Sequence, residues 1–335
     1  MTTRITVIPG DGIGPDIVDS AIQVLDKAGC GLTYDFVDAG LTAFEKHGEL
    51  LPDKTHATLE QNRIALKGPL TTPMGGGFTS INVSLRQHFS LFANLRPVVS
   101  FKGTQARYQD IDIITVRENT EGMYSGLGQT TASDGSEAEA MSKVTRQGCQ
   151  RILHFAYDLA RREGRKKVTA VHKANILKST SGLFLSVARE VAQQYPDIES
   201  EEMIVDATCM KLVMQPENFD VLVTTNLFGD IISDLCAGLV GGLGMAPGAN
   251  IGAKHAIFEA VHGSAPDIAG KDIANPSSVI LAAVQMLEHI GQADKAATIL
   301  AALRDTIESG DRITADLGGL HGTRDFTQAI LDRLA

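Results

Sequence analysis

A short segment that begins at Ser80 carries side chains suited to binding a carboxylate. Ser80 precedes the run INVSLRQHF, in which an apolar residue recurs every four positions. This spacing predicts an amphipathic helix with Ser80 at or near its N-terminus, and it puts Asn82 and Arg86 one turn apart on another face. Arginine binds a carboxylate through two parallel hydrogen bonds, and Arg96 follows ten residues after Arg86. The segment could therefore hold a small molecule with more than one carboxylate, or it could be a capped helix with a solvated face.

A pair of aspartates could bind a divalent cation. Asp230 and Asp234 lie one helical turn apart, directly after an apolar run at 219–225 that predicts a strand. Open α/β sheets place ligands at the carboxyl ends of their strands, and carboxylates without a nearby histidine suit Mg²⁺ or Mn²⁺. Asp206, which also follows an apolar run, could supply a third carboxylate. The alternative is a helix cap with a surface acid.

Three further polar residues follow predicted strands. Arg117 comes directly after the run DIDIITV, where it could bind a ligand or form a structural ion pair. Tyr124 lies in a loop bounded by glycines, which is a suitable place for a proton donor. Lys173 follows the run KKVTAV. Taken alone, Tyr124 and Lys173 could equally be surface residues.

The chain alternates short apolar runs with longer amphipathic ones, which is typical of an α/β protein. Buried strands are predicted at 5–10, 110–116, 166–171 and 219–225, and helices at 15–27 and 143–162. The polar segment 131–140 is predicted to be an exposed excursion.

Composition excludes several classes of protein. With 335 residues the chain is long enough for two domains, and its net charge of −10 without a basic block argues against nucleic acid binding. The longest charge-free stretch, 235–253, contains six glycines and a proline, so no membrane span is predicted. Four cysteines without C-x-x-C spacing indicate reduced thiols, and an apolar strand predicted near the start argues against a signal peptide. We therefore expect a cytoplasmic protein.

The run GDGIGP at 10–15 resembles a dinucleotide-binding turn but departs from it at one position. The G-x-G-x-x-G pattern requires glycine where Pro15 stands, and proline instead suits the first turn of a helix. If the protein binds a dinucleotide, it does so without this Rossmann loop.

Eight motifs occur in a fixed order along nearly the whole chain, from about Arg4 to the DFTQAI run near the C-terminus. They are VIPGDGIGPDI, KGPLTTPMGGG, S-x-N-x-x-x-R, LRP, VRENTEGMYSG, VHKANILK, NLFGDIISD and FEAVHGSAPDIAGKDIANP. This series resembles the isocitrate and isopropylmalate dehydrogenase family, the metal-dependent β-decarboxylating dehydrogenases, and within it the NAD-dependent isocitrate enzymes.

The resemblance implies a two-domain α/β fold with mixed central sheets flanked by helices. Residues 1–98 and 250–335 would form a large cofactor-binding domain. Residues 99–249 would form a small domain with the dimerisation region, including an exposed excursion near 122–148. The resemblance also implies a homodimer whose active sites are shared, with Lys173 and Asp206 coming from the partner chain.

Site residues follow from the resemblance position by position. Tyr124 and Lys173 match the catalytic acid and base. The positions that match substrate-binding residues are Ser80, Asn82, Arg86, Arg96, Arg117 and Asn175, and those that match metal ligands are Asp206, Asp230 and Asp234. The positions that match the cofactor site are Thr71, His262, Gly263, Ser264, Ala265, Asp267, Ile268 and Asn275.

Two local differences within the family predict the substrate and the cofactor. Isopropylmalate enzymes carry apolar or acidic residues where Ser80 and Asn82 stand, whereas a hydroxyl and an amide suit the third carboxylate of isocitrate. NADP-using relatives carry lysine and tyrosine where Asp267 and Ile268 stand, and a carboxylate suits the ribose hydroxyls of NAD. The implied reaction is the oxidative decarboxylation of isocitrate with NAD and Mg²⁺ or Mn²⁺.

Other functions in the same family remain as alternatives. The substrate could be homoisocitrate, 3-isopropylmalate or tartrate. The chain could also be a regulatory subunit of a heteromeric isocitrate dehydrogenase. Such a subunit should have lost acid, base or metal residues, which are intact here.

Overall fold

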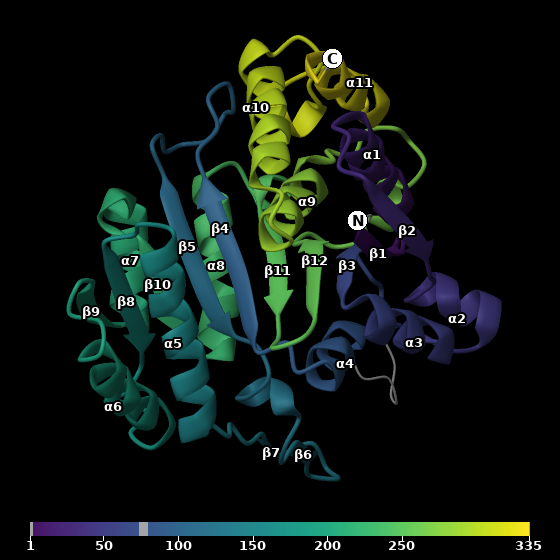
Figure 1. The fold of residues 1–335 in the computed structure, drawn as a ribbon. Coiled ribbons are helices and arrows are strands. Elements are labelled where there is room, and N and C mark those ends of the chain that lie inside the picture. The colour runs from purple at the N-terminus through teal and green to yellow at the C-terminus, as the bar shows by residue number, and fades with distance from the viewer. Residues whose placement is uncertain (1–2, 74–79, 335) are drawn as a thin grey trace.

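The computed structural model describes residues 3–73 and 80–334, whose central feature is a ten-stranded sheet (Figure 1). The strand order is β2-β1-β3-β12-β11-β4-β5-β10-β8-β9. The strands are β1 Thr3–Ile8, β2 Leu32–Phe36, β3 Ile64–Lys67, β4 Ala93–Val99, β5 Asp112–Glu118, β8 Lys167–His172, β9 Glu199–Ile204, β10 Val221–Thr224, β11 Pro247–Ile251 and β12 Ala256–Ala260. The strands predicted at 5–10, 110–116, 166–171 and 219–225 are confirmed as β1, β5, β8 and β10, with ends shifted by a few residues.

The sheet is mixed, with antiparallel pairs at its centre. Strand β11 pairs antiparallel with β12 and β4, and β4 pairs antiparallel with β5. The outer pairs on both sides are parallel. The buried strands are nearly continuous in apolar residues, as expected for a sheet covered on both faces. The predicted mixed α/β fold is confirmed.

Helices cover both faces of the sheet (Figure 1). They are α1 Gly14–Lys27, α2 Leu41–His47, α3 Asp53–Asn62, α4 Ile81–His88, α5 Arg146–Arg162, α6 Thr180–Ala192, α7 Val205–Met214, α8 Asn226–Leu239, α9 Ser277–His289, α10 Ala293–Ser309 and α11 Thr323–Arg333. Helices α1, α5, α6, α9, α10 and α11 share clusters with residues on one face, and α3, α4, α7 and α8 with alternate residues on the other. None of the helices in the described part of the chain is long and apolar enough to cross a membrane.

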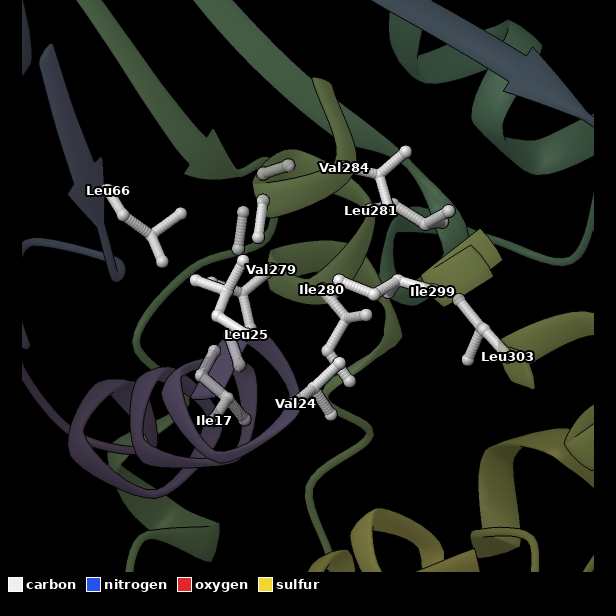
Figure 2. Packing of buried hydrophobic residues seen from close by; sticks show 14 of the residues in the cluster. Ile17, Val24, Leu25, Leu66, Val279, Ile280, Leu281, Val284, Ile299 and Leu303 are labelled. Carbon is white, nitrogen blue, oxygen red and sulfur yellow. The ribbon is translucent and has the colours of Figure 1, made fainter. Parts of the chain in front are cut away.

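The core of the N- and C-terminal segments shows why α1 forms. Pro15 stands in its first turn, Asp16 and Lys27 suit the helix dipole at their respective ends, and Ile17, Val24 and Leu25 recur on one side. Figure 2 shows these apolar side chains packed with those of α9 and α10. This cluster holds α1 against β1 and β3, through Ile5, Val7 and Leu66.

The four hydrophobic clusters draw their residues from different parts of the chain, which bears on the predicted domains. Two join the first hundred residues to the segment after 245, and two lie mainly between residues 93 and 261. The predicted boundaries at 98 and 250 fall within β4 and β11, which pair with each other at the sheet centre. The division into a large and a small domain stays a prediction.

Two predicted segments are refined by the structure. Residues 131–140 are exposed, as predicted, and include parts of the hairpin of β6 Thr130–Thr131 and β7 Ala138–Glu139. Helix α5 begins at Arg146 rather than at the predicted Lys143, because Thr145 is its N-cap and accepts a hydrogen bond from the backbone N of Gly148 at 3.0 Å.

Candidate active site

A row of polar side chains crosses the centre of the sheet on the face covered by α4 and α8. Lys67 in β3 stands beside Glu259 in β12, Asn250 in β11 is opposite Asn94 in β4, and Asn94 is opposite Arg117 in β5. Residues directly opposite each other in neighbouring strands point to the same face. All five side chains are buried among apolar strands, so each of their polar groups needs a hydrogen-bond or ion-pair partner within the protein.

Arg117 is the centre of a buried group that includes Asp230. Its side chain is only 1% exposed, it donates two hydrogen bonds to Asn226 Oδ1 at 2.9 and 2.7 Å, and it donates another to Asp230. Asp230 also accepts a hydrogen bond from the hydroxyl of Tyr124, which lies in the loop after β5. Burial and, to a smaller extent, the nearby Arg86 lower the pKa of Arg117 to about 10.

The same contacts shift the pKa values of the other two members. Burial raises the pKa of the Tyr124 hydroxyl, and its hydrogen bond to Asp230 adds to that rise. Burial alone would raise the pKa of Asp230, but Arg117 and Tyr124 together hold it below its ordinary value. The group therefore keeps an ionised carboxylate beside a protonated phenol, which is a usable proton donor.

Arg96 makes similar contacts, two of them with α8, the helix that also carries Asp230. Its Nη1 donates to Ser233 Oγ at 2.9 Å and to Asp234 Oδ1 at 3.0 Å, and its Nε donates to Asn94 Oδ1 at 2.9 Å. Burial lowers the pKa of Arg96, although Glu259 opposes that shift. Asp230 and Asp234, predicted to share one face of a helix, thus lie over the two buried arginines.

Helix α4 brings a third arginine to this group. Ser80 is at the N-cap position, as predicted, but its hydroxyl makes no capping hydrogen bond. Arg86 is buried, and its Nη2 lies 3.6 Å from Glu259 Oε1. Asn82 has a buried Oδ1 without a hydrogen-bond partner among the described residues. The MGGGFT part of the motif between Pro73 and Ser80 lies outside the described residues.

Lys173 and Asp206 form a separate pair. Lys173 follows β8, Asp206 lies in the first turn of α7, and their Nζ and Oδ1 atoms are 2.7 Å apart. The hydrogen bond from Lys173 lowers the pKa of Asp206, whose side chain is 70% exposed. Asn175 is also exposed. Among residues 3–73 and 80–334 no three histidine, cysteine or acidic side chains gather as a metal site, so one chain does not bring Asp206 to Asp230 and Asp234.

The predicted cofactor residues cluster around the turn after β12. Thr71 Oγ1 and Ser264 Oγ are 2.7 Å apart, although the two segments are far apart in sequence. Nε2 of His262 is buried without a hydrogen-bond partner in the described part of the structure, and burial lowers the pKa of this histidine. Ala265 adopts a left-handed conformation with φ of 38°.

The remaining cofactor positions lie on and beyond this turn. Gly263 and Asp267 are exposed and Ile268 is half-buried, with Asp267 and Ile268 in the short helix Pro266–Ile268. Asn275 is buried, and its Nδ2 donates to Asp316 Oδ2 at 2.9 Å. The turn could therefore present a carboxylate and backbone groups to a nucleotide.

Sequence reasoning missed Asp11, which joins the GDGIG loop to Thr71 and to the start of α2. The Asp11 carboxylate accepts hydrogen bonds from the backbone N of Leu41, from Thr42 N and Oγ1, and from the backbone N of Thr71, at 2.7–3.0 Å. Next to it, Gly12 lies so close to Ser264 that a Cβ atom would stand 1.9 Å from the carbonyl oxygen of that residue. The signal was present, since an acid between two glycines in a buried turn requires a partner.

Sequence reasoning also missed the buried pair Lys67 and Glu259, with Nζ and Oε2 2.7 Å apart. Burial would raise the pKa of Glu259, but the positive charge of Lys67 is the main cause that lowers it, to about 2. A single charge within each apolar strand, IALK and AIFEA, was the available signal.

Comparison with known proteins shows the family to which the chain belongs. The sequence model of the family described as isocitrate/isopropylmalate dehydrogenase matches residues 4–330. The alpha subunit of a mitochondrial NAD isocitrate dehydrogenase from Macaca fascicularis is 47% identical over 98% of this chain and 95% of the relative. A 3-isopropylmalate dehydrogenase from Archaeoglobus fulgidus is also 47% identical, over 99% of both chains.

A solved structure is similar over the full length. The crystal structure of isocitrate dehydrogenase from Methylococcus capsulatus superposes with a TM-score of 0.96 at 55% identity, covering 100% of this chain and 99% of that one. The ordered motifs, the mixed sheet and the polar row on its α4–α8 face lead to the same assignment: the chain belongs to the isocitrate/isopropylmalate dehydrogenase family.

Proposed function

We propose that the protein catalyses the oxidative decarboxylation of isocitrate to 2-oxoglutarate and CO₂, with NAD as oxidant and Mg²⁺ or Mn²⁺ as metal. The observation that carries this proposal is the convergence of Arg86, Arg96 and Arg117. They are close enough that Arg86 lowers the pKa of both other guanidinium groups. Mutually repelling buried cations favour an anionic ligand with several carboxylates.

The charge balance of the site supports a tricarboxylate. Four cations and three carboxylates leave one positive charge, and a divalent metal would raise it to three. Isocitrate carries three negative charges, whereas 3-isopropylmalate carries two and would leave one charge unbalanced. The cations are Lys67, Arg86, Arg96 and Arg117, and the carboxylates are Glu259, Asp230 and Asp234.

The donor set fits a hard cation. Asp230 and Asp234 are one turn apart on α8, the Asp234 side chain is 54% exposed, and both offer only oxygen atoms. When bound, Mg²⁺ or Mn²⁺ would lower the pKa of the substrate hydroxyl and polarise the ketone that forms from it. We assign Asp206 of the partner subunit as the third carboxylate, because one chain does not bring it to the other two.

We also assign roles in substrate binding and proton transfer. The Arg86, Arg96 and Arg117 guanidiniums would bind and orient the substrate carboxylates. Lys173 of the partner subunit would accept the hydroxyl proton as hydride leaves for NAD. Tyr124, whose pKa is raised, would remain protonated and then donate its proton to the carbon from which CO₂ has left.

We assign the turn after β12 to the adenosine end of NAD. Asp267 is an exposed carboxylate with no ion-pair partner in the described part of the chain, and Ile268 offers no charge to a 2′-phosphate. A carboxylate can accept hydrogen bonds from ribose hydroxyls and repels an added phosphate. The buried Nε2 of His262, which has no hydrogen-bond partner among the described residues, provides a further polar atom for the cofactor.

A homodimer completes the proposal. Apolar side chains on the α7–α8 surface are exposed beside the Lys173–Asp206 pair, and such a patch is typical of an interface. They are Met210, Val213, Met214, Leu227 and Ile231. A second copy packed there would bury this surface and supply Lys173 and Asp206 to the neighbouring site.

The second candidate function is 3-isopropylmalate oxidation. It is favoured by the Archaeoglobus relative, which is as similar in identity as the Macaca one. The Ser80 hydroxyl and the Asn82 amide argue against it, because a carboxylate can accept hydrogen bonds from both whereas an isopropyl group would leave these donors without a partner, at about 1–3 kcal/mol each.

Product analysis tests the proposal. Purified protein incubated with isocitrate, NAD and Mg²⁺ should produce NADH, 2-oxoglutarate and CO₂ in equal amounts. The matched reaction with 3-isopropylmalate should be much slower. Absence of NADH from isocitrate, with rapid turnover of another 2-hydroxy acid, would replace isocitrate by that acid.

A further inference from the structure

Two asparagines face each other at the centre of the sheet. Asn94 in β4 and Asn250 in β11 are register partners, and their side chains are 0% and 2% exposed. Asparagine is depleted in strands, and a buried amide is costly unless its donors and acceptor are bonded. Departures from local preference of this kind are expected where a residue serves a site rather than the fold.

The two amides complete a chain of hydrogen bonds between a guanidinium and a carboxylate. Arg96 Nε donates to Asn94 Oδ1 at 2.9 Å, and Asn94 Nδ2 donates to Asn250 Oδ1 at 2.9 Å. Asn250 Nδ2 then donates to Glu259 Oε1 at 2.7 Å. Because a guanidinium can only donate and a carboxylate can only accept, the ends of the chain set the orientation of both amides.

The chain also connects two of the arginines. Glu259 Oε1, which accepts from Asn250, is the oxygen that lies 3.6 Å from Arg86 Nη2. The other oxygen, Oε2, is held by Lys67 at 2.7 Å. Arg86 on α4 and Arg96 on β4 are therefore fixed relative to each other through Glu259 and the two amides.

We propose that Asn250 is a positioning residue that sets the orientation of Arg96 relative to Arg86, and thereby the affinity for substrate. This inference rests on the proposed role of these arginines in binding substrate carboxylates. Replacing Asn250 by an apolar residue would leave Asn94 Nδ2 and Glu259 Oε1 without their present partners. Asn94 would then be free to rotate, and Arg96 would lose its fixed acceptor at Nε.

Asn119 provides a matched control within the same cluster. It is buried, and its Nδ2 donates to Asn250 Oδ1 at 2.9 Å and to the carbonyl oxygen of Leu91 at 3.0 Å. It touches the same amide as Asn94 but does not lie between Arg96 and Glu259. Asn119→Leu therefore removes a hydrogen bond from Asn250 without interrupting the chain.

The experiment compares Asn250→Leu with Asn119→Leu by steady-state kinetics and thermal unfolding. The substrate is whichever 2-hydroxy acid the wild type turns over fastest, so failure of the isocitrate assignment does not affect the test. Asn250→Leu should raise the KM for this acid about tenfold or more, with kcat and the KM for NAD nearly unchanged. Asn119→Leu should lower the unfolding temperature to a similar extent and leave all three constants near wild type.

A second pair of variants, which moves the carboxylate from residue 259 to residue 250, keeps the proposal testable if Asn250→Leu does not fold. Asn250→Asp puts a second carboxylate against Glu259 and should raise the KM for the acid. Adding Glu259→Gln restores a donor–acceptor pair at this link and should recover part of the loss. Wild-type KM values in the Asn250 variants, or an equal rise in Asn119→Leu, would overturn the proposal.

Discussion

Arg117 and Asp230 bind each other while each keeps a second polar partner. Arg117 holds Asn226 through two hydrogen bonds, and Asp230 accepts the hydroxyl of Tyr124. Removal of one partner would leave a buried charge uncompensated, which is costly. The contact also explains how the carboxylate stays ionised although it is more than half buried, because Arg117 and Tyr124 counter the effect of burial on its pKa.

The metal assignment predicts an absolute requirement for a divalent cation. A chelator should abolish activity, and added Mg²⁺ or Mn²⁺ should restore it. Asp234→Asn should raise the Mn²⁺ concentration needed for half-maximal activity by about 10–100-fold or more, because it removes one anionic oxygen ligand. Asp197→Asn, which changes an exposed aspartate paired with Arg161, is the control and should leave the requirement unchanged. Full turnover in metal-free buffer would contradict the assignment.

The proposed role of α4 in substrate binding predicts that a negative charge at Ser80 lowers activity. Ser80→Glu adds a negative charge at the N-cap of α4, where the substrate's own carboxylate is proposed to bind. Repulsion of about 3 kcal/mol, or roughly a hundredfold in kcat/KM, is expected at an effective dielectric constant near 20. Ser80→Gln has the same size without the charge, so it should lose far less activity. Equal losses in the two variants would show that size, not charge, is responsible.

The cofactor assignment predicts a preference for NAD. A 2′-phosphate would bring a charge of about −1.5 to −2 next to Asp267, which should favour NAD several hundredfold, or by about 3–4 kcal/mol. Asp267→Lys with Ile268→Tyr should shift the ratio of kcat/KM values toward NADP by adding a cation and a phenolic donor. The wild-type ratio and the variant ratio are measured with the same substrate. An unchanged ratio would mean that this turn does not contact the ribose.

Shared active sites predict activity from a mixture of inactive variants. Lys173→Met and Asp230→Asn should each be nearly inactive as homodimers. After subunit exchange, half of the dimers are mixed, and one of their two sites has both wild-type residues. The mixture should therefore recover about a quarter of wild-type activity.

The matched control for this mixture pairs two residues assigned to the same chain's site. Mixing Tyr124→Phe with Asp230→Asn leaves every site with one defect, so no activity should return. No recovery in the Lys173 mixture despite confirmed exchange would place Lys173 in its own chain's site, whereas recovery in the control would contradict the assignment of Tyr124 and Asp230 to the same chain's site.

Local periodicity and residue order predicted much of this molecule. The four strands named from their apolar runs are present, and the four-residue apolar spacing correctly identified α4 with Ser80 at its N-cap. The one-turn spacing of Asp230 and Asp234 correctly put both on one helix face, because helix geometry is a local property.

The contacts that depend on strand register could not be predicted in the same way. Asn94 and Asn250 are 156 residues apart, and their pairing follows from the order β11-β4-β5 rather than from either neighbourhood. A register slip of one residue would move each side chain to the other face. The same applies to Lys67 and Glu259, which only the pairing of β3 with β12 brings together.

The central claim is that the site selects a tricarboxylate, and one ratio tests it most directly. This is kcat/KM for isocitrate divided by kcat/KM for 3-isopropylmalate, measured on the wild type with NAD and saturating Mg²⁺. The charge balance and the hydrogen-bond donors of Ser80 and Asn82 predict a preference for isocitrate of about tenfold or more. A ratio at or below one would contradict the account and identify the apolar side chain of 3-isopropylmalate as the group that the α4 helix accommodates.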